Sequence, residues 1–294
     1  MKPFFLVETT TRDKLIHQGI FYRSKKSGKQ ALLWVHGLTS NFYGHIALFE
    51  EFAEACDDAG FGFAAFNNRG HDMVTGIRKI DKRKPKGYDH AIGGAGYEVF
   101  AESVHDIEAG IDFLVGQGYS KVVVIGESTG ANKVCYYTAT QKHPHFFGTI
   151  LVSPISDRLT QEFDAYKLQT DLAYMQDRVN LGHGDVLQSG YSLFPLTPKR
   201  FLSLLSPNSL EDQFDYGDPR PQLTYFSQIK TPLLVIFGGN DEHADRSVQK
   251  IKKVFDEYAF SPNYKSVVIP DALHSYNGKE KELVETIVNW VNKL

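Results

Sequence analysis

A short segment near the middle of the chain limits the possible folds more than any other. Residues 122–130 begin with three valines and an isoleucine and continue as Gly-Glu-Ser-Thr-Gly. Four consecutive branched apolar residues are typical of a strand buried on both faces. A small polar residue flanked by glycines directly after such a strand indicates a sharp turn, because glycine allows close backbone contacts that a side chain would block. The segment therefore predicts a strand, a tight turn and a helix, with Ser128 exposed at the turn.

The turn has the pattern G-x-S-x-G, which places a serine nucleophile at the end of a strand in many hydrolases. The amide groups at the start of the following helix would favour negative charge at the same place. As an isolated pattern the motif is weak. Between a buried strand and a helix it is strong. The alternative is an ordinary strand-to-helix turn whose serine has no chemical role.

Strand-like and helix-like segments alternate along much of the remaining chain. Such alternation predicts an α/β fold with a mostly parallel sheet and helices on both faces. The first 25 residues contain strand patterns without an intervening helix, so we expect an antiparallel start. The expected strands are residues 30–35, 61–66, 121–125, 147–153, 233–237 and 265–269, and the expected helices are residues 47–59, 97–115, 129–141, one segment after 237 and the last segment of the chain.

Residues 154–231 interrupt this alternation. We interpret them as a helical cap over one edge of the sheet, inserted into a core formed by residues 1–153 and 232–294. The alternative is a set of amphipathic helices that pack on the core. The segment is rich in aromatic residues, which would suit an apolar or aromatic substrate group: Phe163, Tyr166, Tyr174, Tyr191, Phe194, Phe201, Phe214 and Tyr216.

A serine hydroxyl needs a base to accept its proton, and the chain contains 11 histidines. His274 is the best candidate, because it follows the last expected strand and can reach back over the sheet edge. The acid that orients this histidine should follow another strand. Asp241 in Asn240-Asp241-Glu242 is the preferred acid, and Asp157 after the strand ending near residue 153 is the alternative.

The negative oxygen formed during acyl transfer needs hydrogen-bond donors. The loop Val35-His36-Gly37-Leu38 follows the first central strand and can supply a backbone amide. We assign the N–H groups of Leu38 and Thr129 to this oxyanion hole. We expect His36 to brace the loop and not to transfer protons.

At this point the chain resembles the α/β-hydrolase superfamily over nearly its whole length. The order Ser128, Asp241, His274 is the order of the catalytic triad in that superfamily. Within it, the chain looks most like serine esterases and acylglycerol-lipase-like enzymes, with a fainter similarity to hydrolases that cleave siderophore esters. One segment departs from the superfamily pattern. In many relatives this segment begins with aspartate and ends in His-Gly, whereas this chain has Asn68-Arg69-Gly70-His71-Asp72. That segment shapes the loop beside the site and says little about catalysis.

The resemblance implies hydrolysis of a small-molecule carboxylic ester through an acyl-serine. An amidase or peptidase with the same triad is one alternative. A non-catalytic binding protein that has kept the fold is the other. The residues show no nucleotide-binding glycine pattern after a strand and no metal-ligand spacing, so we expect no cofactor and no metal.

The net charge of −3 gives no reason to expect a nucleic-acid partner. No apolar run is long enough to span a membrane, and the one at the N-terminus is too short for a signal peptide. We therefore expect a cytoplasmic protein, with Cys56 and Cys135 as buried thiols. Its oligomeric state cannot be read from the sequence. The basic residues within 78–86 indicate a solvated loop, with a docking patch for an anionic substrate as the alternative.

Overall fold

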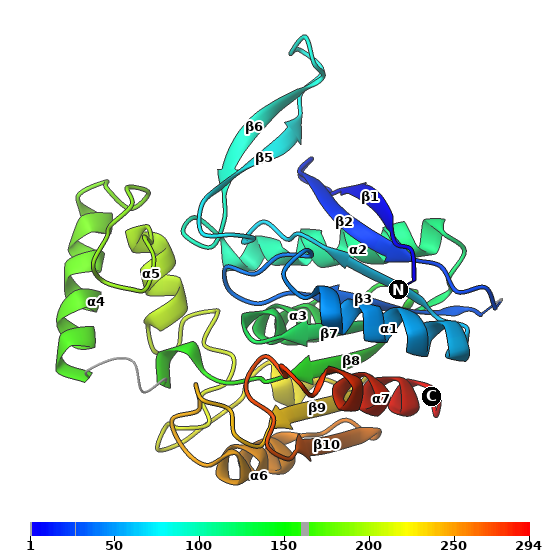
Figure 1. The fold of residues 1–294 in the computed structure, drawn as a ribbon. Helices are drawn as coiled ribbons and strands as arrows, with labels where there is room; N and C mark the ends of the chain where they lie inside the picture. Colours follow the sequence, from blue (N-terminus) through cyan, green and yellow to red (C-terminus); the bar gives the residue numbers. More distant parts are fainter. Residues whose placement is uncertain (1, 27, 160–164) are drawn as a thin grey trace.

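The computed structural model describes residues 2–26, 28–159 and 165–294. Within them, a central sheet of eight strands runs through the molecule in the order β1-β2-β4-β3-β7-β8-β9-β10 (Figure 1). The strands are β1 (Phe5–Thr10), β2 (Ile16–Tyr22), β3 (Gln30–Val35), β4 (Gly62–Phe66), β7 (Lys121–Glu127), β8 (Phe146–Val152), β9 (Leu233–Gly238) and β10 (Tyr264–Ile269).

The direction of the strands agrees with the sequence pattern. β2 pairs antiparallel with both β1 and β4, which confirms the antiparallel start. From β4 to β10 every neighbouring pair is parallel. The carboxyl ends of these strands therefore meet at one edge of the sheet, where the loops carrying the predicted site residues leave it.

Helices cover both faces of the sheet, as the α/β pattern predicts (Figure 1). α1 (Ile46–Ala59) and α7 (Glu280–Val291) pack on one face, and their apolar residues share a core cluster with alternate residues of the central strands. α2 (Ser103–Gly116), α3 (Thr129–Thr140) and α6 (Val248–Tyr258) pack on the other. Cys56 in α1 and Cys135 in α3 are buried free thiols in these layers.

The segment predicted as a cap contains α4 (Ala165–Asn180) and α5 (Pro198–Leu205), which lie together beyond one end of the sheet (Figure 1). They contribute to a separate apolar cluster that includes Met175, Phe194, Phe201 and Leu205.

The later part of the same segment packs differently. Phe214, Tyr216 and Phe226 belong to the main core and lie around Phe255 of α6. The aromatic residues of the segment therefore divide between two clusters, and Tyr166 is exposed. Phe163, also named above, lies outside the described residues.

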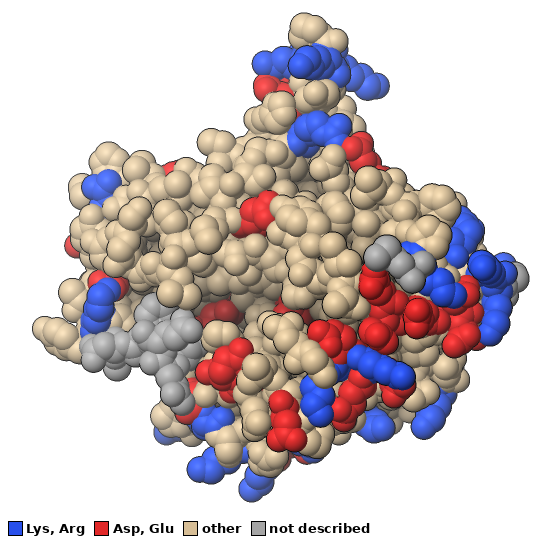
Figure 2. All heavy atoms as spheres, in the orientation of Figure 1, with Lys and Arg blue, Asp and Glu red and all other residues tan. Residues whose placement is uncertain are grey.

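The interpretation of residues 78–86 as a loop holds for residues 81–86 and is wrong for residues 78–80, which end a strand. β5 (Thr75–Ile80) and β6 (Tyr88–Gly93) form an antiparallel hairpin that projects from the body of the molecule, with basic side chains at its tip (Figures 1 and 2). The short strands carry charged residues and a glycine, so the sequence lacks the alternating apolar pattern of a strand. Ion pairs join Arg78 to Glu8, Arg83 to Asp81 and Lys84 to Asp89.

The helix predicted at residues 97–115 begins later than expected. A 3₁₀ turn (Phe100–Glu102) precedes α2, and Val99 has an extended backbone. The preceding residues are held by the neighbouring loop, because the amide of Gly96 donates to the carbonyl of Met73. In the part of the chain that the structure describes, no helix combines the length and the apolar character needed to cross a membrane.

Candidate active site

The turn around Ser128 has the geometry that its flanking glycines suggest. Ser128 has φ 56° and ψ −127°, a conformation that residues with a side chain seldom adopt. A Cβ atom on Gly126 would lie 2.3 Å from the carbonyl oxygen of Gly130. A Cβ on Gly130 would lie 2.2 Å from the carbonyl oxygen of Val35. Neither position can accept a side chain without moving backbone, so the glycines are required by the turn.

His274 and Asp241 come together at the carboxyl edge of the sheet. Nδ1 of His274 lies 2.8 Å from Oδ2 of Asp241, and both side chains are buried. Asp241 follows β9 and His274 follows β10, and these two strands are neighbours. With Nδ1 bound to the carboxylate, Nε2 is the ring nitrogen that remains available to accept a proton.

Further contacts hold the His274 loop in place. The amide of His274 donates to Oε2 of Glu242 at 2.8 Å, and its carbonyl accepts the hydroxyl of Ser153 at 3.0 Å. The ring of His243 packs edge to face against the ring of His274, with the ring centroids 4.9 Å apart. Sequence reasoning gave no role to Glu242. Its position next to Asp241 was the only signal, and this did not show where the carboxylate points.

Two opposing influences act on the pKa of His274. Burial lowers the pKa, while the hydrogen bond and the negative charge of Asp241 raise it, and the net effect is a raised pKa. No hydrogen bond joins the Ser128 hydroxyl to the His274 ring in the described structure, although both line one cavity. Such bonds are often long before substrate binds.

The cavity above Ser128 has a volume of about 600 Å³. Its wall includes residues of the loop after β3, the turn, the loops after β8 and β10, and the segment before and within α5. Its apolar side chains are Leu38, Met73, Ile155, Leu193, Phe194, Leu204 and Leu205. Of the aromatic residues predicted to contact substrate, only Phe194 lines this cavity among those described.

Asp157, the alternative acid, also lines the cavity, and no hydrogen bond or ion pair joins it to His274 among the described residues. Its Oδ2 accepts a hydrogen bond of 3.3 Å from Nδ2 of Asn132. Desolvation by burial, reinforced by the negative charge of Glu211, raises the pKa of Asp157 to about 7. A carboxyl group with a strongly raised pKa in a cavity wall is a common feature of functional sites.

The residues proposed as oxyanion donors lie in the loop after β3 and directly after Ser128. Leu38 lines the cavity, and Thr129 is the first residue of α3, where amide groups have no acceptor within the helix. His36 is buried and bridges two loops. Its Nδ1 lies 2.9 Å from the carbonyl oxygen of Gly37, and its Nε2 accepts the amide of Asn68 at 3.0 Å. These contacts confirm the bracing role expected for His36.

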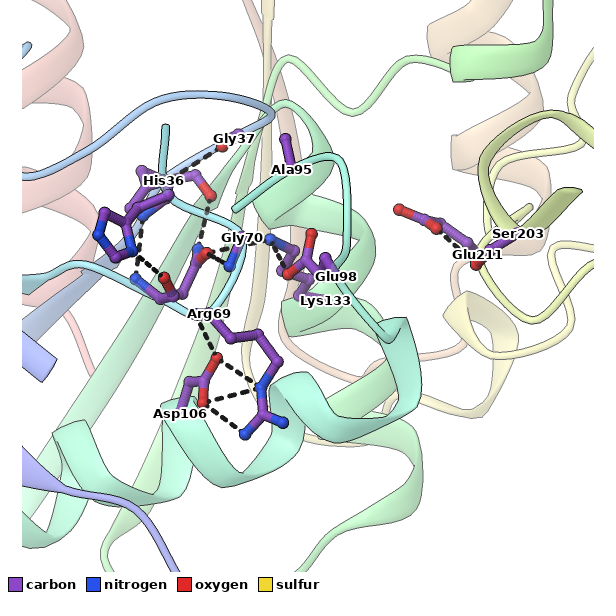
Figure 3. A network of polar contacts seen from close by, with 12 residues as sticks. His36, Gly37, Arg69, Gly70, Ala95, Glu98, Asp106, Lys133, Ser203 and Glu211 are labelled. Carbon is purple, nitrogen blue, oxygen red and sulfur yellow. Dashed lines mark hydrogen bonds and ion pairs between the residues drawn. The ribbon is translucent and has the colours of Figure 1, made fainter. Parts of the chain in front are cut away.

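A buried polar network continues from this brace toward α5 (Figure 3). Lys133 of α3 lies 3.4 Å from Oδ1 of Asn68 and 2.7 Å from Oε1 of Glu98. Arg200 of α5 pairs with Glu98 at 3.4 Å and with Glu211. These charges are paired out of water, so removal of one partner would leave another buried and unpaired. The network connects the loop after β4 that contacts His36, the helix after Ser128 and α5. The sequence gave no signal for it, because its members are far apart along the chain.

The sheet order, the helices on both faces and the turn at Ser128 together define the α/β-hydrolase fold. Residues 87–293 match the family described as "Protein of unknown function (DUF1749)", and the chain belongs to this family. No curated protein matches the chain.

Solved structures of several ester-cleaving enzymes share this fold. An esterase from Pyrococcus furiosus is 20% identical with a TM-score of 0.62, and the alignment covers 99% of this chain and 91% of the esterase. A siderophore hydrolase from Aspergillus fumigatus is 17% identical with a TM-score of 0.68, covering 100% and 98%. A monoglyceride lipase from Saccharomyces cerevisiae is 14% identical with a TM-score of 0.66, covering 97% and 94%. At these identities the similarity establishes the fold alone.

Proposed function

We propose that this protein is a serine hydrolase that cleaves a small-to-medium carboxylic ester through an acyl-enzyme. The observation that carries the proposal is the buried Asp241–His274 pair, because its histidine lines the same cavity as the strained Ser128. The esterase and lipase activities printed for proteins of the same fold support it. Fold alone would not, since the same scaffold serves many functions.

In this mechanism Ser128 Oγ attacks the ester carbonyl while Nε2 of His274 accepts the hydroxyl proton. The carbonyl oxygen becomes negative and is bound by the N–H groups of Leu38 and Thr129. His274 then gives its proton to the leaving alcohol as the C–O bond breaks. Water, deprotonated by His274, attacks the acyl-serine. The bond between the acyl carbon and Ser128 Oγ then breaks as His274 returns the proton to Oγ, and the acid product leaves. Asp241 stabilises the imidazolium that forms in each half.

An amidase or peptidase would use the same residues on a poorer leaving group. A matched ester and amide of one acyl group separates the two, and we expect the ester to be cleaved faster. The non-catalytic alternative predicts no turnover at all. We also propose that residues 154–231 act as the cap of this site. Leu193, Leu204 and Leu205 from this segment form part of the cavity wall and support that role.

The decisive experiment treats the protein with a fluorophosphonate probe and measures its intact mass, followed by peptide mapping. We expect one adduct, on Ser128, that is lost in Ser128→Ala and strongly reduced in His274→Ala. Both variants should also lose nearly all ester turnover. An adduct on another residue, or none on the folded protein, would contradict the proposed nucleophile and favour the binding-protein alternative.

A further inference from the structure

The charges that face the proposed active-site cavity have one sign. Glu127 and Asp157 are its acidic wall residues, and no lysine or arginine is among the described residues that line it. The histidines of the wall are His45, His243 and His274. A cavity of this kind favours a cationic group over an anionic one, because a substrate carboxylate would lie near negative charge in a partly desolvated site.

The two wall carboxylates differ in what they already bind. Oε2 of Glu127 accepts the amide of Gly37 at 3.2 Å, so this side chain holds the loop after β3. Asp157 has one hydrogen bond in the described structure, the 3.3 Å contact of its Oδ2 with the neutral amide of Asn132. Its Oδ1 accepts no hydrogen bond from the described residues. Asp157 is therefore the carboxylate free to bind a group in the cavity.

The basic side chains of the buried network form ion pairs with residues other than Asp157. Lys133 pairs with Glu98, and Arg200 pairs with Glu98 and Glu211. The charges of these two basic and two acidic side chains neutralise one another. No basic side chain of this network is therefore paired with Asp157. Asp157 is partly buried and has no ion pair among the described residues. Such a carboxylate is costly to ionise unless a ligand supplies the positive charge.

We infer that Asp157 is the specificity-determining residue of this cavity and that it selects ester substrates carrying a primary ammonium group away from the reacting carbonyl. The inference rests on the proposed ester hydrolysis and names its substrate class. An ammonium group can donate to Oδ1 of Asp157 and balance its charge. A methyl group of similar size can do neither. The expected preference is about 10- to 100-fold, the range for a hydrogen bond between charged groups.

The test compares matched substrates in two series. In the acyl series the 4-nitrophenyl esters carry 6-aminohexanoyl, heptanoyl, 6-hydroxyhexanoyl or the singly charged adipoyl group. In the alcohol series 6-aminohexyl butanoate is compared with heptyl butanoate. We measure kcat/KM for each and use the ratio of the ammonium ester to its methyl analogue as the readout, because a ratio is insensitive to the amount of active enzyme.

In the wild-type protein we expect this ratio to be at least about 10 in one series, with the adipoyl ester the poorest acyl substrate. In Asp157→Asn the ratio should fall to about 1, since a neutral amide keeps the shape and loses the charge. The control is Asp177→Asn, which removes an exposed carboxylate of α4 that does not line the cavity and should leave the ratio unchanged. If Asp157→Asn does not fold, Asp157→Ser takes its place.

Three outcomes would overturn the inference: a ratio near 1 in both series for the wild-type protein, a ratio that persists in Asp157→Asn, or a preference for the hydroxyl over the ammonium ester. These differ from failure of the proposed function, which would appear as no turnover of any ester together with no probe adduct on Ser128. That result would remove the inference as well.

Discussion

The loops after β8 and β9 each bring an aspartate to the same end of the sheet, yet the two carboxylates have different surroundings. Asp241, after β9, is bound to Nδ1 of His274 at 2.8 Å. Asp157, after β8, is bound to the amide of Asn132 and lines the cavity. Both follow neighbouring strands of one parallel sheet, so position at the sheet edge does not by itself determine which aspartate orients the histidine.

The strand order explains the difference. His274 lies in the loop after β10, and β9 is the direct neighbour of β10. β8 lies one strand further away and is the direct neighbour of β7, the strand that leads into Ser128. The loop after β9 is therefore close to the histidine, and the loop after β8 is close to the space above the serine. We therefore expect Asp241 to support proton transfer by His274 and Asp157 to contact the substrate.

Replacing each aspartate by asparagine is the strongest test of this assignment. Asp241→Asn should lower kcat on a neutral 4-nitrophenyl ester by about 10⁴-fold, because the histidine is left in the wrong tautomer. Asp157→Asn should lower kcat on the same ester by less than about 10-fold, since it alters one hydrogen bond, to the neutral side-chain amide of Asn132. A larger loss for Asp157→Asn than for Asp241→Asn would reverse the two roles.

The pH dependence of the reaction sharpens the role of Asp241. His274 must be neutral to accept the serine proton, so kcat/KM should rise with pH as the ring loses its proton. Because Asp241 raises the pKa of His274, the midpoint should lie above the ordinary value of 6.5. In Asp241→Asn the residual activity should have a lower midpoint. A midpoint that is the same in both proteins would show that Asp241 does not act on His274.

A smaller effect is expected from Glu242, which holds the backbone of His274 and not its ring. Glu242→Ala should lower kcat by about 10-fold, the size of one hydrogen bond to a charged group, and should leave KM nearly unchanged. Glu257→Ala in the exposed last turn of α6 is the control and should have no effect. A large change in KM would instead place Glu242 in substrate binding.

Local sequence signals predicted the core of the fold and the turn at Ser128, because both depend on short patterns. The central strands are continuous apolar runs, and the turn needs glycines at fixed positions. The strands observed at β3 and β9 agree with the predicted ranges to within one residue. The candidate triad residues could be named because each follows a strand, although that pattern left Asp157 open as the acid.

Features formed by distant residues could not be predicted in this way. The hairpin of β5 and β6 is polar, and beyond an isolated bridge between Lys79 and Leu15 its described strands pair with each other and not with the central sheet. The network around Lys133 and Arg200 joins residues from segments far apart along the chain, and neither residue carries a pattern that marks it as buried. The aromatic residues of 154–231 divide between two clusters. This division likewise depends on how the chain returns to the core after α5.

The last difference between the two aspartates should appear in stability. The pKa of Asp157 is raised to about 7 from a usual 3.8. At a pH between these two values, Asp157 is protonated in the folded protein and ionised in the unfolded chain. Stability should therefore fall as pH rises from about 4 to about 7, because ionisation of the folded protein is resisted by burial and by Glu211 and is only partly favoured by Arg200, His274 and Lys133.

Asp157→Asn removes this titration, since asparagine stays neutral. The free energy of unfolding of the variant relative to the wild-type protein, measured with urea, should be higher at pH 8 than at pH 5. His274 titrates in both proteins, so its contribution to the free energy of unfolding cancels in the difference. Asp177→Asn, on the exposed side of α4, should give a difference that does not change with pH. A difference for Asp157→Asn that is equally independent of pH would mean that this carboxylate is already ionised without cost in the empty cavity. The case for a cationic substrate group would then rest on the cavity charge alone.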